Sequence, residues 1–226
     1  MIRDCILSWI ICLVGIKLIK PFKKPLEAIL RKLAKDNNIR TFHFVTYSAD
    51  IDSNKLGPEE VEPYQLIPVR ASYLKTHPLS DLARQYCATD DVFGIASTVW
   101  VPEGEGVVRK EIVQLDIDAQ WPDTRRPQMT DADVPFDVAR RASESCGQSS
   151  YLVHSSTSFG FCQSFHFYGK KLVTHDEWRV LMRNVESNSL VDHRWSEYNL
   201  ARGYSVLRVS ANKIKPQAPV PVLQMV

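Results

Sequence analysis

Several common signatures are missing from this sequence of 226 residues. The five cysteines form no C-x-x-C pair and there is no N-x-S/T acceptor, so neither a zinc knuckle nor a disulfide framework is indicated. This cysteine usage fits a reducing compartment, cytoplasmic or otherwise intracellular. No expected strand is followed by a glycine-rich phosphate loop, which argues against a doubly wound Rossmann-like sheet. The net charge is only +2, so any nucleic-acid binding needs a local basic face.

The sequence also has no apolar run of membrane-spanning length. Residues 5–16 are almost wholly apolar, but a span needs about 18 to 20 such residues. Lys17 then follows where a signal peptide would carry small residues before its cleavage site. We therefore favour a buried or partner-facing helix here, with membrane contact as the less favoured alternative.

What is present is an alternation of strand pairs and helices. Helices are expected over 26–34, 79–86, 134–145 and 175–185, and strands over 41–47, 92–101, 107–117, 151–158, 161–168 and 206–209. The order predicts an α+β fold. We divide the chain into an apolar and basic helical segment (1–35), a main domain (36–215) and a proline-rich tail (216–226), which we expect to be loose or docked.

The strongest chemical signal lies in the expected strand around residues 111–120. If this segment is extended, Asp116 and Asp118 project from one face while apolar residues anchor the other. Paired carboxylates on a rigid element suit hard divalent cations, which prefer oxygen ligands. Two other D-x-D patterns, at 50–52 and 131–133, lie in polar stretches and are interpreted as a turn and a helix start.

Two further segments complete the pattern. Ser164 and His166 share one face of an expected strand, and the flanking phenylalanines would hold the histidine rigidly. Asp192 follows two apolar residues and would supply a third carboxylate. Arg202 and Arg208 follow it, and guanidinium groups suit triphosphate or template contacts. Ordinary surface or core roles remain open for each of these residues taken alone.

Taken in order, D-x-D, S-x-H and a hydrophobic residue followed by aspartate resemble the motifs of the archaeo-eukaryotic primase superfamily. The resemblance spans about residues 92–212. It implies a catalytic core made of an αβ module beside an RRM-like module, with the active site in the cleft between them. It also implies that Asp116, Asp118 and Asp192 are catalytic and hold two divalent ions, Mg²⁺ or Mn²⁺. Ser164, His166, Arg202 and Arg208 would then be nucleotide-binding residues.

The function expected from this resemblance is a primase or polymerase that makes or extends a primer on single-stranded DNA from nucleoside triphosphates. Because the sequence has no cysteine-rich zinc module, either a partner supports initiation or the protein only extends. A helicase or an accessory primase subunit, bound through the N-terminal helix, would be such a partner.

Two other classes of function stay open. One is a non-catalytic nucleic-acid-binding replication protein or a degenerate primase subunit, which would not need the three aspartates. The other is a metal-dependent nuclease, which would use the same carboxylates without nucleoside triphosphates. A rolling-circle initiator is discounted because the sequence contains no H-x-H.

Overall fold

The computed structural model describes residues 19–21, 24–48, 64–88, 91–120, 134–157, 162–187, 190–211 and 218–225. The predictions for residues 1–18, including the apolar run at 5–16, and for the D-x-D patterns at 50–52 and 131–133 lie outside the described residues. Within the described residues, no helix is long and apolar enough to cross a membrane.

Most of the described elements lie where the sequence predicts them, but the helix at His193–Arg202 and the short helix at Tyr73–Lys75 were not predicted. The helices are α2 (Leu26–Asp36), α3 (Leu79–Tyr86), α4 (Val134–Cys146), α5 (His175–Ser187), α6 (His193–Arg202) and the short 3-10 helix η2 (Tyr73–Lys75). The strands are β1 (Ile19–Pro21), β2 (Thr41–Ser48), β3 (Ile67–Arg70), β4 (Asp91–Glu103), β5 (Gly106–Gln120), β6 (Ser150–Thr157), β7 (Cys162–Val173), β8 (Val206–Arg208) and β9 (Val220–Met225).

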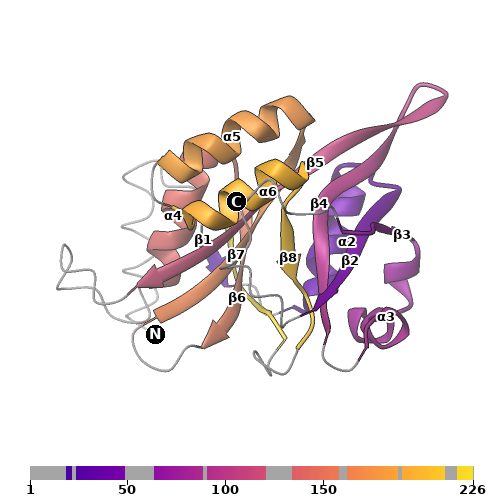
Figure 1. The fold of residues 1–226 in the computed structure, drawn as a ribbon, viewed down its shortest axis with the longest axis horizontal. Helices are drawn as coiled ribbons and strands as arrows, with labels where there is room; N and C mark the ends of the chain where they lie inside the picture. Colours follow the sequence, from indigo (N-terminus) through magenta and orange to yellow (C-terminus); the bar gives the residue numbers. More distant parts are fainter. Residues whose placement is uncertain are drawn as a thin grey trace.

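All strands join one antiparallel sheet, in the order β1-β9-β6-β7-β5-β4-β2-β3, with β8 paired to β4 beside this path. Helices and an antiparallel sheet together confirm the predicted α+β class. Figure 1 shows α4, α5 and α6 gathered on one side, and α2 and α3 beside β2, β3 and β4.

The sheet has an apolar core on each side. The first lies under α4 and α5, where alternate residues of β5 and β7, including Leu115 and Phe167, are fully buried. The second lies against α2, whose residues Ile29, Leu30 and Leu33 are fully buried or nearly so. Burying such a side chain contributes about 1.5 to 3 kcal/mol relative to exposure, so both helices are fixed mainly by packing.

The long central hairpin follows the sequence pattern closely. β4 and β5 pair as far as Glu103 and Gly106, which leaves Gly104 and Glu105 as the loop. Gly104 is left-handed, with φ of 57°, at the first loop position, where a type II′ turn needs glycine. The hairpin therefore sets the register of β5, the strand that carries the acidic pair.

Three short strands were not predicted from the sequence: β1, β3 and β9. Most of the proline-rich tail that the structure describes is β9, which pairs with β6 on one side and with β1 on the other. Pro21, Pro68 and Pro221 interrupt the apolar alternation of these segments, and proline weakens the strand signal because it gives no N–H. Pairing with distant strands, rather than local pattern, makes them extended.

Candidate functional site

The acidic pair of β5 lies on the sheet face that α4 and α5 do not cover. Val113, Leu115 and Ile117 of the same strand are buried in the cluster with those helices. Because side chains alternate along a strand, Asp116 and Asp118 project from the opposite face. The side chain of Asp116 is 31% exposed and Asp118 is exposed, so this face is open to a ligand at the acidic pair.

Strand register brings the second motif onto the same face. β5 and β7 are antiparallel, with Asp116 opposite His166 and Asp118 opposite Ser164. Side chains directly opposite one another across two strands have Cβ atoms about 4.5 to 5.5 Å apart. Four predicted site residues from two distant segments therefore meet; we call Asp116, Asp118, Ser164 and His166 the acidic face.

Direct contacts link the two strands within the acidic face. The hydroxyl of Ser164 donates a hydrogen bond of 2.5 Å to Oδ1 of Asp118. Nε2 of His166 lies 3.7 Å from Oδ1 of Asp116. The imidazole is only 3% exposed, so its position is fixed by packing and it presents one edge to the carboxylate. Ser164 and His166 thus orient the acidic pair.

Arg208 brings a positive charge to this face. It is buried, and its guanidinium donates hydrogen bonds to the backbone carbonyls of Ser155 and Ser210. Burial lowers the pKa of Arg208, while the nearby Tyr47 and Asp116 act to raise it. An arginine remains protonated under such conditions, so its charge acts on the Asp116 carboxylate.

Two phenols interact with the same charges, the buried Tyr168 and the partly exposed Tyr47. Burial raises the pKa of Tyr168 above its ordinary value, and Asp116 raises it further. Burial likewise raises the pKa of Tyr47, which stacks on Tyr64 with ring centroids 5.0 Å apart. Both phenols therefore stay neutral at physiological pH and can donate hydrogen bonds without adding negative charge.

Arg202 is held by an aromatic ring. Its guanidinium carbon lies 4.1 Å from the centroid of the Tyr64 ring, and the Tyr64 carbonyl accepts a hydrogen bond from the hydroxyl of Tyr204. Such cation–π contacts are worth about 0.5 to 2 kcal/mol and fix the direction of the side chain. Its predicted role as a nucleotide-binding residue stays a prediction.

Asp192 lies at a helix start and is not brought to the acidic face. It is the N-cap of α6, and its Oδ1 accepts a hydrogen bond of 3.1 Å from the backbone N–H of Trp195. Leu190 and Val191, just before it, are buried in the cluster that contains Leu115, on the helix-covered side. Its predicted role as a third metal ligand rests on the resemblance alone.

The acidic pair is the described feature that suits a metal ion. Mg²⁺ is commonly bound by one or two carboxylates together with substrate phosphates. Asp116 and Asp118 match that donor set for one ion shared with a nucleotide. Across the described ranges, no group of three histidine, cysteine, aspartate or glutamate side chains lies close enough to hold a metal. The second of the two predicted ions stays a prediction that depends on Asp192.

The sequence analysis missed a buried carboxylate on the opposite face. Glu111 is fully buried, accepts a hydrogen bond of 2.6 Å from Ser97 and pairs with Arg109 Nε at 2.7 Å. Arg109 also donates to the carbonyl of Gly203 at 2.6 Å, and His175 lies 3.4 Å from Glu111. This network ties β4 and β5 to the start of α5 and the end of α6. Its only sequence signal is a charged residue inside an apolar strand.

Comparison with known proteins identifies a primase-like region within this fold. Residues 131–220 match a primase family model, so this region is primase-like at the family level. The model is described as AEP-like, archaeo-eukaryotic primase 1D-like. Over residues 131–220, the match confirms the resemblance to archaeo-eukaryotic primases that the motifs indicated. No curated protein and no solved structure matches the chain.

The matched segment covers part of the site. It contains Ser164 and His166 of β7, Asp192 and both candidate arginines, while Asp116 and Asp118 lie before it on β5. The acidic face therefore combines residues from inside and outside the matched segment. Ser164 and His166, inside it, stand directly opposite the two aspartates, which lie outside it.

Proposed function

We propose that this protein is a metal-dependent nucleotidyltransferase that makes or extends a primer on a single-stranded DNA template from nucleoside triphosphates. The observation that carries the proposal is the acidic face, with Asp116 opposite His166 and Asp118 opposite Ser164 on adjacent strands. The primase-like family match supports the same class of reaction.

Each residue of the acidic face has a role in the proposal. Asp116 and Asp118 bind Mg²⁺ or Mn²⁺ together with the triphosphate. When bound there, such an ion would supply positive charge at the phosphates and would lower the pKa of a 3′-hydroxyl. Ser164 orients Asp118 through its hydrogen bond of 2.5 Å, and the buried His166 contacts the phosphates from beside Asp116. Oriented ligands of this kind bind a metal more tightly than freely rotating ones.

Arg208 would complete the electrostatics. Its buried guanidinium offers a fixed positive charge that acts on Asp116 and would also attract the negative charge of a triphosphate. Arg202, held on Tyr64, would contact the nucleotide or the template from further out. The proposed division of the core into an αβ module and an RRM-like module, with the active site in the cleft between them, rests on the resemblance alone, because the two apolar clusters lie on opposite faces of one continuous sheet.

One observation favours a second candidate, a non-catalytic primase subunit that binds nucleic acid. In the part of the chain that the structure describes, only two carboxylates meet on the acidic face, and the charge of Arg208 acts on one of them, Asp116. The positive charge of Arg208 partly neutralises the carboxylates that a bound metal ion would otherwise neutralise. A binding protein needs no metal, so its affinity for DNA would survive chelation.

The deciding experiment is nucleotide incorporation on single-stranded DNA with Mg²⁺ or Mn²⁺, with and without a primer. Asp116→Ala should reduce incorporation by more than about a hundredfold, because a metal ligand contributes several kcal/mol to the transition state. Asp81→Ala is the matched control, since Asp81 forms an exposed pair with Arg84 on α3. Equal activity of Asp116→Ala and wild type would contradict the catalytic assignment.

A further inference from the structure

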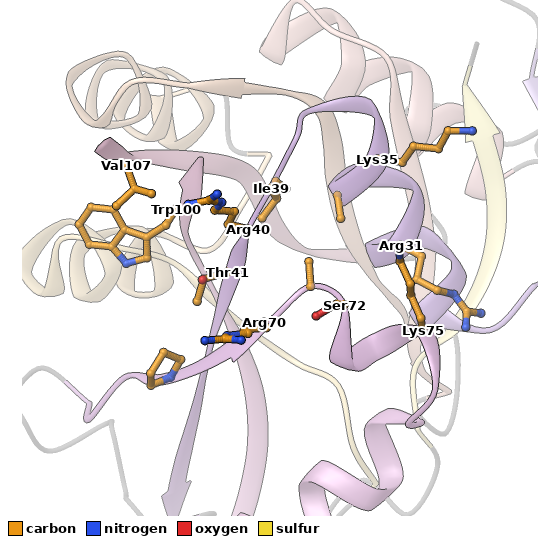
Figure 2. Close-up of a pocket in the computed structure, with 13 residues that line it drawn as sticks. Arg31, Lys35, Ile39, Arg40, Thr41, Arg70, Ser72, Lys75, Trp100 and Val107 are labelled. Atoms are coloured by element: carbon orange, nitrogen blue, oxygen red, sulfur yellow. The ribbon is translucent and has the colours of Figure 1, made fainter. Parts of the chain in front are cut away.

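A large basic cavity lies at the end of the sheet where β3 stands. Its volume is about 1090 Å³, and residues of α2, β3, η2 and the β4–β5 hairpin line it (Figure 2). Every charged residue that lines it is a cation; they are Arg31, Lys35, Arg40, Arg70 and Lys75. We call this cavity the basic groove. Its charge is notable because the whole chain carries a net charge of only +2.

The five cations come from separate parts of the chain and are all exposed. Arg31 and Lys35 are one helical turn apart on α2, Arg70 ends β3, and Lys75 ends η2. In the described part of the chain, none of the five pairs with a carboxylate; Asp36 pairs instead with Lys32, at 3.0 Å. The groove therefore concentrates positive charge that described acidic residues do not neutralise.

An aromatic platform lies at one end of the groove. Figure 2 shows Trp100 beside Arg40 and Thr41, below Val107. The indole N–H of Trp100 donates a hydrogen bond of 3.0 Å to Nε2 of His43, whose Nδ1 lies 3.1 Å from the carbonyl oxygen of Thr98. Nδ1 thus carries the proton and Nε2 accepts. Trp100 is partly exposed and cannot turn freely, which suits it for stacking.

The opposite end of the groove is purely cationic. Arg31 and Lys75 project there from α2 and η2, as Figure 2 shows. Nη1 of Arg31 is 3.4 Å from the carbonyl of Leu74, which holds the guanidinium near Lys75. A ligand that fills the groove thus meets an indole at one end and separate positive charges along its length.

We propose that the basic groove binds single-stranded nucleic acid, with phosphates on the five cations and a base stacked on Trp100. Single-stranded nucleic acid is bound by grooves that combine cations along the backbone with aromatic rings for the bases. A free phosphate would need one or two of these charges, and an acidic peptide would have no use for the fixed indole.

The groove lies apart from the acidic face. Val107, which lines the groove, and Asp116 are nine positions apart on β5, which corresponds to roughly 30 Å of strand. A single strand held in the groove would be anchored at a distance from the metal ligands. This inference does not depend on catalysis at the acidic face.

The test is fluorescence anisotropy with a labelled oligothymidylate in the presence of a chelator, so that no metal contributes. The double variant Arg40→Gln/Arg70→Gln should bind more weakly. The slope of log affinity against log salt should fall by about 1.4, because each phosphate contact contributes about 0.7 for single strands. The control Arg141→Gln/Arg183→Gln removes the same charge from α4 and α5, where both arginines are exposed, and should leave affinity and slope unchanged.

The indole is tested separately. Trp100→Leu should weaken binding about tenfold, while the salt slope stays the same, because stacking carries no charge. Circular dichroism and thermal unfolding show whether each variant is folded. If Trp100→Leu does not fold, the double arginine variant, which changes only exposed side chains, still decides the proposal.

Three outcomes would overturn the proposal. The first is an equal loss of affinity in the control and in the groove variant. The second is an unchanged salt slope in Arg40→Gln/Arg70→Gln. The third is equal competition by polyglutamate or duplex DNA, which would assign the groove to an acidic protein or to duplex. Asp116→Ala should bind normally in chelator, so loss of primer synthesis and loss of groove binding are separable results.

Discussion

On β5 and β7, four polar side chains stand at spacings set by strand register, and two of them, Ser164 and His166, are buried. At the β3 end of the sheet, five exposed cations extend from separate segments into one groove. The first arrangement depends on positions held to a fraction of an ångström, and one altered side chain destroys it. The second depends on summed charge, so its loss is gradual. The comparison separates a region suited to chemistry from one suited to affinity.

After the loss of incorporation in Asp116→Ala, the largest effect expected on this comparison comes from removing the charge of Arg208, which acts on the acidic face. Arg208→Gln should tighten Mn²⁺ binding at Asp116 several-fold, because a positive charge no longer opposes the ion. The same variant should lose about 1 to 3 kcal/mol of stability, because the carbonyls of Ser155 and Ser210 lose a charged donor. Titration by electron paramagnetic resonance measures the first effect and urea unfolding the second.

Two controls make that result specific. Arg208→Lys keeps the charge and should leave Mn²⁺ affinity near that of wild type. Arg202→Gln removes an arginine held on Tyr64 and should also leave the Mn²⁺ affinity unchanged. Weaker or equal Mn²⁺ binding in Arg208→Gln would show that this guanidinium does not act on the acidic pair.

A smaller effect is expected at Asp192. As an N-cap it should stabilise α6, so Asp192→Ala should cost about 1 kcal/mol in unfolding free energy, whereas Asp192→Asn should retain most of it. Nucleotide incorporation then separates the two roles. If Asp192 is a metal ligand, both variants should lose nucleotide incorporation. Full activity of Asp192→Asn would remove Asp192 from the predicted site and leave the acidic pair as its only described carboxylates.

The smallest effect concerns pH and the platform of the basic groove. Burial lowers the pKa of His43 below its ordinary value of 6.5, so the unfolded chain binds this proton more readily than the folded one. The contribution of neutral His43 to the free energy of unfolding is therefore fully present above about pH 6.5, and it is lost as the pH falls through the lower pKa of the folded state. Urea unfolding at neutral and mildly acidic pH should show a larger loss for wild type than for His43→Gln. Equal losses would contradict a buried neutral His43.

Much of the fold follows from local sequence pattern. α2, α3, β2, β4 and β5 lie close to the ranges that the sequence pattern predicts. The strands of the two main motifs also follow from alternation, which puts Asp116 with Asp118 and Ser164 with His166. Alternation alone does not predict that these two pairs stand opposite each other. Their pairing depends on the register of β5 and β7, which shifts at an irregularity between Ile112 and Gln114.

The remaining features depend on contacts between distant residues. The pattern of two apolar residues before Asp192 fits a motif aspartate and a helix N-cap equally well, so the N-cap of α6 and the packing of Leu190 and Val191 could not be read from it. The basic groove has no sequence signal at all. Its cations are scattered from Arg31 to Lys75 among acidic neighbours, and only the fold gathers them beside Trp100.

The pairing of β9 has a consequence for how this protein is made. β6 pairs with β7 on one side and with β9 on the other, and β9 in turn holds β1. During synthesis, β6 and β7 leave the ribosome before residues 218–225 do, so the free edge of β6 stays exposed to other chains for that time. Contacts of such long sequence separation also slow folding. A chaperone that covers this edge would therefore raise the yield of folded protein most when translation is slow.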